Sequence, residues 1–303
     1  MLKSERPLLG MSLMVLGIAF LVSKDGIAKY LTADYSAATL LWIQYVSTWL
    51  ILAPVIVFLH GWKSLWPHPF GAQLLRGLFA FATVLLFFEA VKTIPLAEAH
   101  AMVFVGPLTA TALAPVFLDE RVGWRRWLAV AVGFLGVLLI LRPEFSGERT
   151  AYFLALGSGF SIGGFFIMNR KTAHSAPPLA SVAHSVIFGT ILLIPYLMTT
   201  QSSGTVEEGS GFAMLHFLGF VILALLGQTL LILSFSFATA SNVAVFHYSG
   251  IIFSTIIGYF AFGEFPTLVS WIGILLVVGC GLFIAWREHV ARKVIQPGKS
   301  GSD

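Results

Sequence analysis

Ionisable residues interrupt several apolar stretches of this chain, and they are its first candidates for chemistry. Four of them fall near one end of their stretches: Asp25, Glu89, Lys92 and His100. Because a charge inside a bilayer is expensive, such residues usually face a cavity or an opposite charge. The spacing of Glu89 and Lys92, three residues apart, predicts an ion pair along one helix face. We expect the four residues to carry a proton or gate a pathway, or else to form an interfacial network that ties helix ends together.

A second set of residues lies deeper within the apolar stretches. Six are candidate contacts for a small molecule: Gln44, Phe160, His184, Gln228, His247 and Tyr248. A polar side chain in a membrane helix often does no more than hydrogen-bond to a neighbouring helix, and an aromatic one often only packs. Both interpretations stay open for each residue: a contact between helices, or a contact with a metabolite in a cavity.

The sequence lacks the common motifs of ATP-driven pumps and zinc enzymes. Neither a G-x-x-x-x-G-K-[ST] phosphate loop nor an H-E-x-x-H zinc motif occurs in the sequence. The histidines are scattered singly, and Cys280 is the single cysteine, which excludes an intramolecular disulfide and a cysteine-based metal site. We therefore expect no enzymatic activity, no cofactor and no metal site.

The composition places these residues in a membrane. Of 303 residues, 57% are hydrophobic and only 11% are charged, and the mean hydropathy is +0.89. Soluble domains carry about a quarter charged residues, so this chain has too few to cover a water-facing surface. The net charge is +4. We interpret the excess of Lys and Arg as typical of the cytoplasmic loops of a membrane protein and not as a sign of nucleic-acid binding. The sequence therefore predicts a polytopic membrane protein in contact with lipid.

Ten continuous apolar segments follow one another, each long enough for a membrane helix of about 20 residues. Backbone groups in lipid must bond internally, so each segment is predicted to be an α-helix and the fold class to be all-α. Most Lys and Arg residues fall on the side of the N-terminus, which predicts a multi-pass protein of the cell inner (plasma) membrane with both termini cytoplasmic. The segments are residues 8–28, 36–59, 73–92, 96–117, 124–142, 150–169, 179–199, 211–237, 240–261 and 267–286.

The two halves of the sequence are similar to each other at an offset of 144 residues. The stretch 104–106 (FVG) aligns with 248–250 (YSG), and Trp127 aligns with Trp271. Each half holds five predicted helices, and because five is odd, the second half must enter the membrane upside down, as an inverted-topology repeat. The predicted organisation is a first repeat at 1–145, a second repeat at 146–290 and a cytoplasmic tail at 291–303.

Short motifs in both halves also match a known pattern. They are FEAVKTIPLAEA at 88–99, GPL at 106–108 and LDERV at 118–122, with a second copy in YSGI at 248–251 and FGE at 262–264. Together with ten helices and the internal repeat, they resemble the EamA-type members of the drug/metabolite transporter superfamily over residues 8–287. One departure is Gln44, since many relatives carry a basic residue in the second helix. The resemblance therefore does not imply pairing with an anion at that position.

The resemblance implies a secondary active transporter that moves a small metabolite by alternating access around a central cavity. The substrate classes considered are amino acids, nucleobase-type compounds, flavins and similar amphiphiles, with protons as the candidate coupling ion. Substrate, protons and membrane lipid are thus the expected partners, and the sequence indicates no oligomeric state and no direction of transport. The alternative is a non-transporting membrane subunit or sensor, which would not need polar residues in the middle of the membrane.

Overall fold

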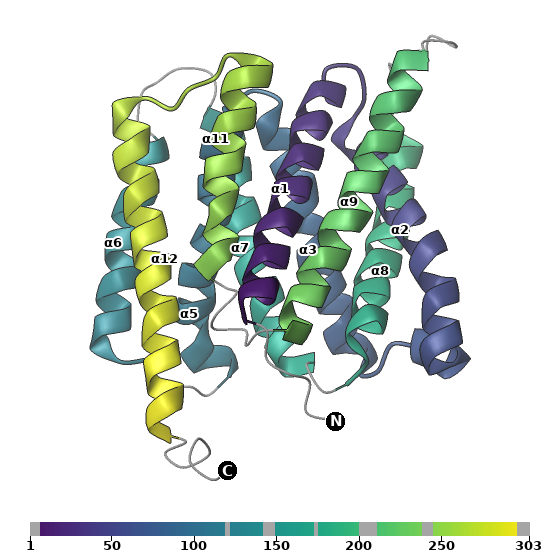
Figure 1. Cartoon of the computed structure of the whole chain (residues 1–303), viewed down its shortest axis with the longest axis horizontal. Helices are drawn as coiled ribbons and strands as arrows, with labels where there is room; N and C mark the ends of the chain where they lie inside the picture. The colour runs from purple at the N-terminus through teal and green to yellow at the C-terminus, as the bar shows by residue number, and fades with distance from the viewer. Residues whose placement is uncertain are drawn as a thin grey trace.

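The described part of the chain is a bundle of helices that run alternately up and down (Figure 1). The computed structural model describes residues 7–118, 122–141, 149–172, 175–199, 211–237 and 245–295, and no strand occurs within them. The all-helical prediction is confirmed. The elements are α1 (Pro7–Leu31), α2 (Ala37–His60), η1 (Trp62–Leu65), α3 (Phe70–Val91), α4 (Leu96–Val103), α5 (Val105–Phe117), α6 (Trp124–Leu141), α7 (Arg149–Thr172), α8 (Pro178–Thr199), α9 (Gly211–Phe237), η2 (Val245–Tyr248), α11 (Ser249–Phe262) and α12 (Leu268–Ile295).

Length and composition suit these helices to a membrane. Six spans among the described residues are long and apolar enough to cross one, with mean hydropathies between 1.5 and 2.0, and α4 and α5 count together as one of them. Large apolar side chains also cover the outside of the bundle, where Phe58 is 88% and Phe260 81% exposed. A surface of this kind suits contact with lipid, because large exposed apolar patches are rare on soluble proteins.

Helices from the two halves of the sequence pack in pairs. α1 lies along α9, α3 along α7, α2 along α8 and α6 along α12. Figure 1 shows α1 beside α9 and α6 beside α12. Each of these pairs joins one helix that ends before residue 142 with one that begins after residue 148. The core of the bundle is therefore an interface between the halves rather than a core within each half.

The fourth predicted helix is broken. The helix is interrupted at Phe104, between α4 and α5, three residues before Pro107. The reason is that Pro107 has no N–H to donate to the carbonyl of Val103, four residues earlier. Tyr248, which aligns with Phe104 in the internal repeat, ends the 3-10 turn η2 where α11 begins. The rings of Phe104 and Tyr248 stack, with centroids 4.8 Å apart and planes inclined at 27°.

Two glycines let α7 approach α4 and α5 closely. A Cβ atom at Gly159 would overlap the carbonyl oxygen of Met102, and one at Gly163 would lie 2.6 Å from Cβ of Thr109. This is the role expected of a small-xxx-small pair in a membrane helix. It holds the first helix of the second half against the broken helix of the first half.

Some predicted features differ from the structure or lie outside its described residues. The final helix extends beyond the predicted end at residue 286, because a helix need not stop where it leaves the apolar region. The loop residues 119–121 and 201–208, and the predicted helix start at 240–244, lie outside the described residues.

Candidate functional site: a central cavity and a polar network at one end

A cavity of about 330 Å³ lies between α1, α2, α3, α7, α8 and α9. Its volume is at the lower end of the range of about 300–1,000 Å³ that is typical of small-molecule pockets. Most of its lining is apolar. The polar residues that line it are Gln44, Tyr45, Thr48, Ser185, Gln228 and Thr229.

The cavity is not centred along the bundle. We name the end where α1 begins and α12 ends the near end, and the opposite end the far end (Figure 1). Gln44 lies two turns into α2, which starts at the far end, and Leu21 lies beyond the middle of α1. Other lining residues reach the near end, where Leu179 is in the first turn of α8 and Leu233 is close to the end of α9. The cavity therefore extends from the interior toward the near end.

The chemistry of the cavity is that of uncharged hydrogen-bonding groups. None of the described residues that line it is charged. The side-chain oxygen Oε1 of Gln44 is buried and has no hydrogen-bond partner among the described residues. Buried polar atoms are nearly always satisfied, so Gln44 is a lining residue whose hydrogen-bonding capacity the protein leaves partly unused. A charged ligand group would find no opposite charge in this lining and would lose its hydration without compensation.

Among the six deep candidates, Gln44 and Gln228 line the cavity together, from α2 and α9. The other four do not line it. His184 is buried, with Nε2 3.1 Å from the carbonyl oxygen of Ser64. Phe160 is 42% exposed and stacks on Phe134 of α6.

His247 and Tyr248 lie in the 3-10 turn η2, which leads directly into α11. Both rings pack against Phe104, His247 edge-on with centroids 5.6 Å apart and Tyr248 stacked at 4.8 Å. They therefore belong to the contact between η2 and the break at Phe104 rather than to the lining of the cavity.

The four ionisable candidates form two separate groups. Asp25 lies 2.6 Å from Nζ of Lys24 through one carboxylate oxygen, and 3.4 Å from Nε2 of His100 through the other. This group is buried between α1 and α4. Glu89 and Lys92 form the ion pair predicted from their spacing, at 2.6 Å, with both side chains more than a quarter exposed. The structure thus joins Asp25 to His100 and leaves Glu89 and Lys92 apart from them.

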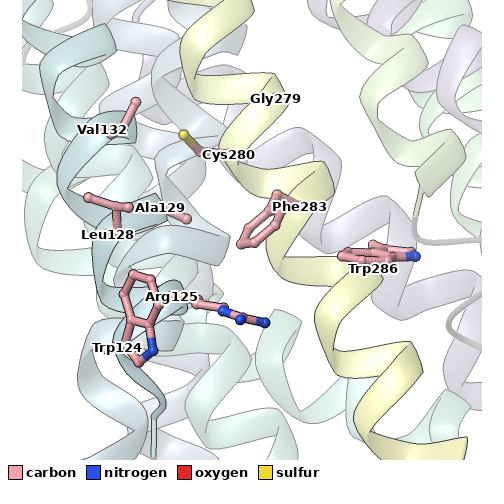
Figure 2. A pocket seen from close by; sticks show the side chains of 9 residues that line it. All are labelled: Trp124, Arg125, Leu128, Ala129, Val132, Gly279, Cys280, Phe283 and Trp286. Carbon is pink, nitrogen blue, oxygen red and sulfur yellow. The ribbon is translucent and has the colours of Figure 1, made fainter.

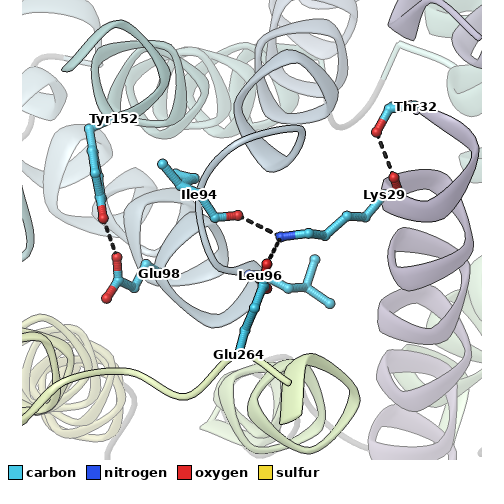
Figure 3. Close-up of polar contacts among 7 residues, drawn as sticks. All are labelled: Lys29, Thr32, Ile94, Leu96, Glu98, Tyr152 and Glu264. Atoms are coloured by element: carbon cyan, nitrogen blue, oxygen red, sulfur yellow. Dashed lines mark hydrogen bonds and ion pairs between the residues drawn. The ribbon is translucent and has the colours of Figure 1, made fainter. Parts of the chain in front are cut away.

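A further polar network at the far end was not among the predicted sites (Figure 3). Lys29 donates to Oε1 of Glu264 at 2.6 Å and to the carbonyl of Ile94 at 2.8 Å. The other oxygen of Glu264 accepts the N–H of Leu96 at 3.2 Å.

A second carboxylate lies beside that contact. Glu98 is 3% exposed and accepts the hydroxyls of Tyr152 and Ser270, each at 2.5 Å. The signal in the sequence was an acidic residue within an apolar segment. Its hydroxyl partners could not be identified, because they come from α7 and α12, far away along the chain.

A second groove lies on the outside of the bundle between α6 and α12 (Figure 2). Its volume is about 480 Å³, and its lining is aromatic and aliphatic apart from Arg125 and Cys280. It includes none of the residues that we selected as candidates. Trp124 and Trp286, both largely exposed, line its mouth, as expected where a helix meets the membrane surface.

One stretch of the sequence has the spacing of a catalytic motif. Residues 159–163 read G-x-S-x-G, a spacing found around the nucleophile of some hydrolases, but they lie in the interior of α7 rather than in a strand–turn–helix. In that position Ser161 is not presented as such nucleophiles are. Among the described residues, no three His, Cys, Asp or Glu side chains gather closely enough to hold a metal ion.

Comparisons with known proteins relate the chain to transporters. The sequence pattern of the EamA-like transporter family matches residues 8–142 and, a second time, residues 149–286. An S-adenosylmethionine uptake transporter of Rickettsia bellii is 26% identical over 93% of this chain and 95% of its own length. A riboflavin transporter of Vibrio cholerae is 26% identical over 91% of this chain and 93% of its own length.

Two further proteins are similar to this chain. A pseudopaline exporter of Pseudomonas aeruginosa is 28% identical over 68% of this chain and 72% of its own length. One solved crystal structure superposes with a TM-score of 0.61, covering 95% of this chain and 99% of the other, at 18% sequence identity. That similarity supports the fold alone.

Proposed function

Because this chain belongs to the EamA-like transporter family, we propose that it carries a small, uncharged metabolite across the inner membrane by alternating access through the central cavity. The single observation that carries the proposal is the cavity itself. It lies between helices of both halves and presents two amide side chains, Gln44 and Gln228, with no charged residue among its described lining.

The arrangement of the helices supports the alternating mechanism. α1 packs against α9 and α11, and α7, the first helix of the second half, packs against α3 and α5. α3 and α9 hold the same place in their respective halves, as do α5 and α11, so the contacts are exchanged between halves. An inverted repeat with such contacts has two related conformations, each open on one side. The double match of the family pattern supports the same division of the chain.

The lining of the cavity supports a choice among the candidate substrates. Nucleobase-type and flavin-type compounds are planar, are uncharged and carry amide edges that a glutamine side chain can hydrogen-bond in both directions. Amino acids and S-adenosylmethionine carry charged groups, which this lining would leave unpaired. A riboflavin-like substrate therefore fits the cavity better than an S-adenosylmethionine-like one, although transporters of both kinds are similar to this chain.

The orientation follows from charge. The excess of Lys and Arg on the loops of the near end supports a cytoplasmic position for this end and both termini. The cavity then extends toward the cytoplasm while the far end is closed. Coupling to protons, if transport is concentrative, is assigned to Asp25 and His100, the buried pair, before Glu89 and Lys92, the exposed pair.

Counterflow into proteoliposomes tests the proposal. Vesicles that contain the purified protein and are preloaded with unlabelled riboflavin should take up labelled riboflavin or a labelled nucleobase in a saturable way. An excess of S-adenosylmethionine should compete weakly. Vesicles without protein give the background. Saturable uptake of S-adenosylmethionine alone would contradict the uncharged substrate, and the absence of counterflow for every class would favour a non-transporting subunit or sensor.

A further inference from the structure

We propose that the far end of the bundle is a gate and that the ion pair between Lys29 and Glu264 is the latch that holds it shut, with Glu98 as a second closing contact. The proposal rests on the proposed transport function for its purpose. Its structural content, a reversible separation of the two halves at this end, can be tested without any substrate.

Four hydrogen bonds of the network join the two halves of the chain. Lys29, Leu96 and Glu98 belong to the first half, matched by the family pattern at 8–142. Their partners belong to the second half, matched at 149–286: Tyr152, Glu264 and Ser270. Separating the halves at this end would break all four of these hydrogen bonds at once.

The latch is placed where charge attraction is effective. The Lys29 side chain is 8% exposed, and its ammonium group also lies 5.2 Å from the centre of the Phe262 ring. Glu264 is 26% exposed, so water reaches its side of the pair. An ion pair shielded on one side and wet on the other is strong enough to hold a closed state and can still be rehydrated when it opens.

The loop that carries Glu264 fixes it in position. Gly263 has a φ of +67°, in the left-handed region that favours glycine, and it ends α11. The N–H groups of Gly263 and Glu264 then donate back to the carbonyls of Tyr259 and Gly258. The carboxylate is therefore presented at a defined place above the first turn of α4, where the N–H of Leu96 is available because a helix start leaves such groups unpaired.

Polar contacts between the halves also occur at the near end, where Gln73 donates to Ser175 and Arg76 donates to the carbonyl of Ser181. Leu179 and Leu233 line the cavity there with apolar side chains, and the cavity extends toward that end. The near end thus combines such contacts with a cavity, whereas the far end holds the ion pair between Lys29 and Glu264, which joins the two halves by charge. A purely structural role for the network predicts that breaking it lowers stability without moving the halves apart.

The distance between the halves can be measured directly. Spin labels are attached to cysteines replacing Asp34 and Phe265, which are exposed at the far end in opposite halves, with Cys280→Ser removing the native thiol. Electron–electron resonance on the substrate-free protein should give one main distance. Lys29→Glu places two carboxylates together, and we expect most molecules to shift to a longer distance. The double variant Lys29→Glu/Glu264→Lys should restore the original distance in part, because it re-forms the ion pair but not the hydrogen bonds with the Ile94 carbonyl and the Leu96 N–H.

Controls separate the latch from general damage. Glu89→Lys disrupts an ion pair with the same 2.6 Å separation, between Glu89 of α3 and Lys92 directly after that helix. Both residues belong to the first half, so the distance between the spin labels should stay unchanged. If Lys29→Glu does not fold, Glu264→Gln is the milder variant and should give a smaller shift in the same direction. An unchanged distance in a folded single variant, or no restoration in the double variant, would overturn the latch. Because no substrate is present, that result would leave the counterflow test of transport unaffected.

Discussion

Replacing Asp25 with alanine is expected to lower the free energy of unfolding by about 3–5 kcal/mol, because it leaves the buried ammonium group of Lys24 without its carboxylate. The two side chains are 12% and 7% exposed, and Nζ of Lys24 lies 2.6 Å from the Asp25 oxygen. The ammonium group of Lys24 also lies 5.0 Å from the centre of the Phe88 ring and 5.7 Å from that of the Phe220 ring. These rings replace only part of the lost attraction. Reversible unfolding in mixed micelles measures the change.

A double variant and an exposed pair serve as controls for Asp25. Lys24→Met/Asp25→Leu removes both charges and should recover most of the stability, since a buried pair contributes little more than apolar residues of the same size. Glu89→Ala breaks a pair of equal length that is more than a quarter exposed, and it should change stability by less than about 1 kcal/mol. Equal losses in Asp25→Ala and Glu89→Ala would contradict the account of Asp25 as the partner of a buried charge.

Replacing either cavity amide with leucine should reduce transport by about tenfold. Gln44→Leu and Gln228→Leu each remove a hydrogen bond to the substrate and leave its polar edge facing an apolar side chain. Such an unpaired group costs roughly 1–3 kcal/mol, and about 1.4 kcal/mol corresponds to a factor of ten. The loss should be seen in the initial rate of counterflow at low substrate concentration.

A third glutamine provides the control for these variants. Gln73 is fully buried outside the cavity, where it donates to Ser175 at 3.0 Å. Gln73→Leu should lower thermal stability and leave the substrate concentration at half-maximal rate unchanged. Gln44→Leu should leave thermal stability unchanged, because its Oε1 has no protein partner to lose. It should instead raise the substrate concentration at half-maximal rate. Full transport by both cavity variants would show that substrate passes elsewhere.

The helices could be predicted from the sequence because lipid leaves the backbone few alternatives. Every N–H and carbonyl must bond within its own helix, so a long apolar run predicts a helix with little ambiguity. The break in the fourth helix was predictable for the same reason: Pro107 cannot supply one of those bonds. Its position at Phe104, one turn earlier, follows from which carbonyl loses its donor.

The site could be predicted only in part, because apolar periodicity does not tell which face of a membrane helix is inside. Gln44 and Gln228 line the cavity, while His184 lies one residue from the cavity-lining Ser185 and is directed at the carbonyl of Ser64 instead. One residue along a helix is a rotation of about 100°. Both helix faces are apolar in such a helix, so nothing in the sequence distinguishes the two orientations.

The partners within the far-end network could not be predicted for another reason. Lys29 and Glu264 are separated by 235 residues, and Glu98 and Ser270 by 172. Pairing over such distances depends on how the halves are assembled. The local sequence indicates only that a lone charge needs a partner.

The most direct test of the central claim is the accessibility of one cavity residue from each side of the membrane. Thr229→Cys in a Cys280→Ser background places a single thiol in the lining of the cavity. A membrane-impermeant maleimide added from the cytoplasmic side should label it in the substrate-free protein. During counterflow, the same reagent added from the opposite side should label it as well. Labelling from one side only, with and without substrate, would contradict alternating access through this cavity.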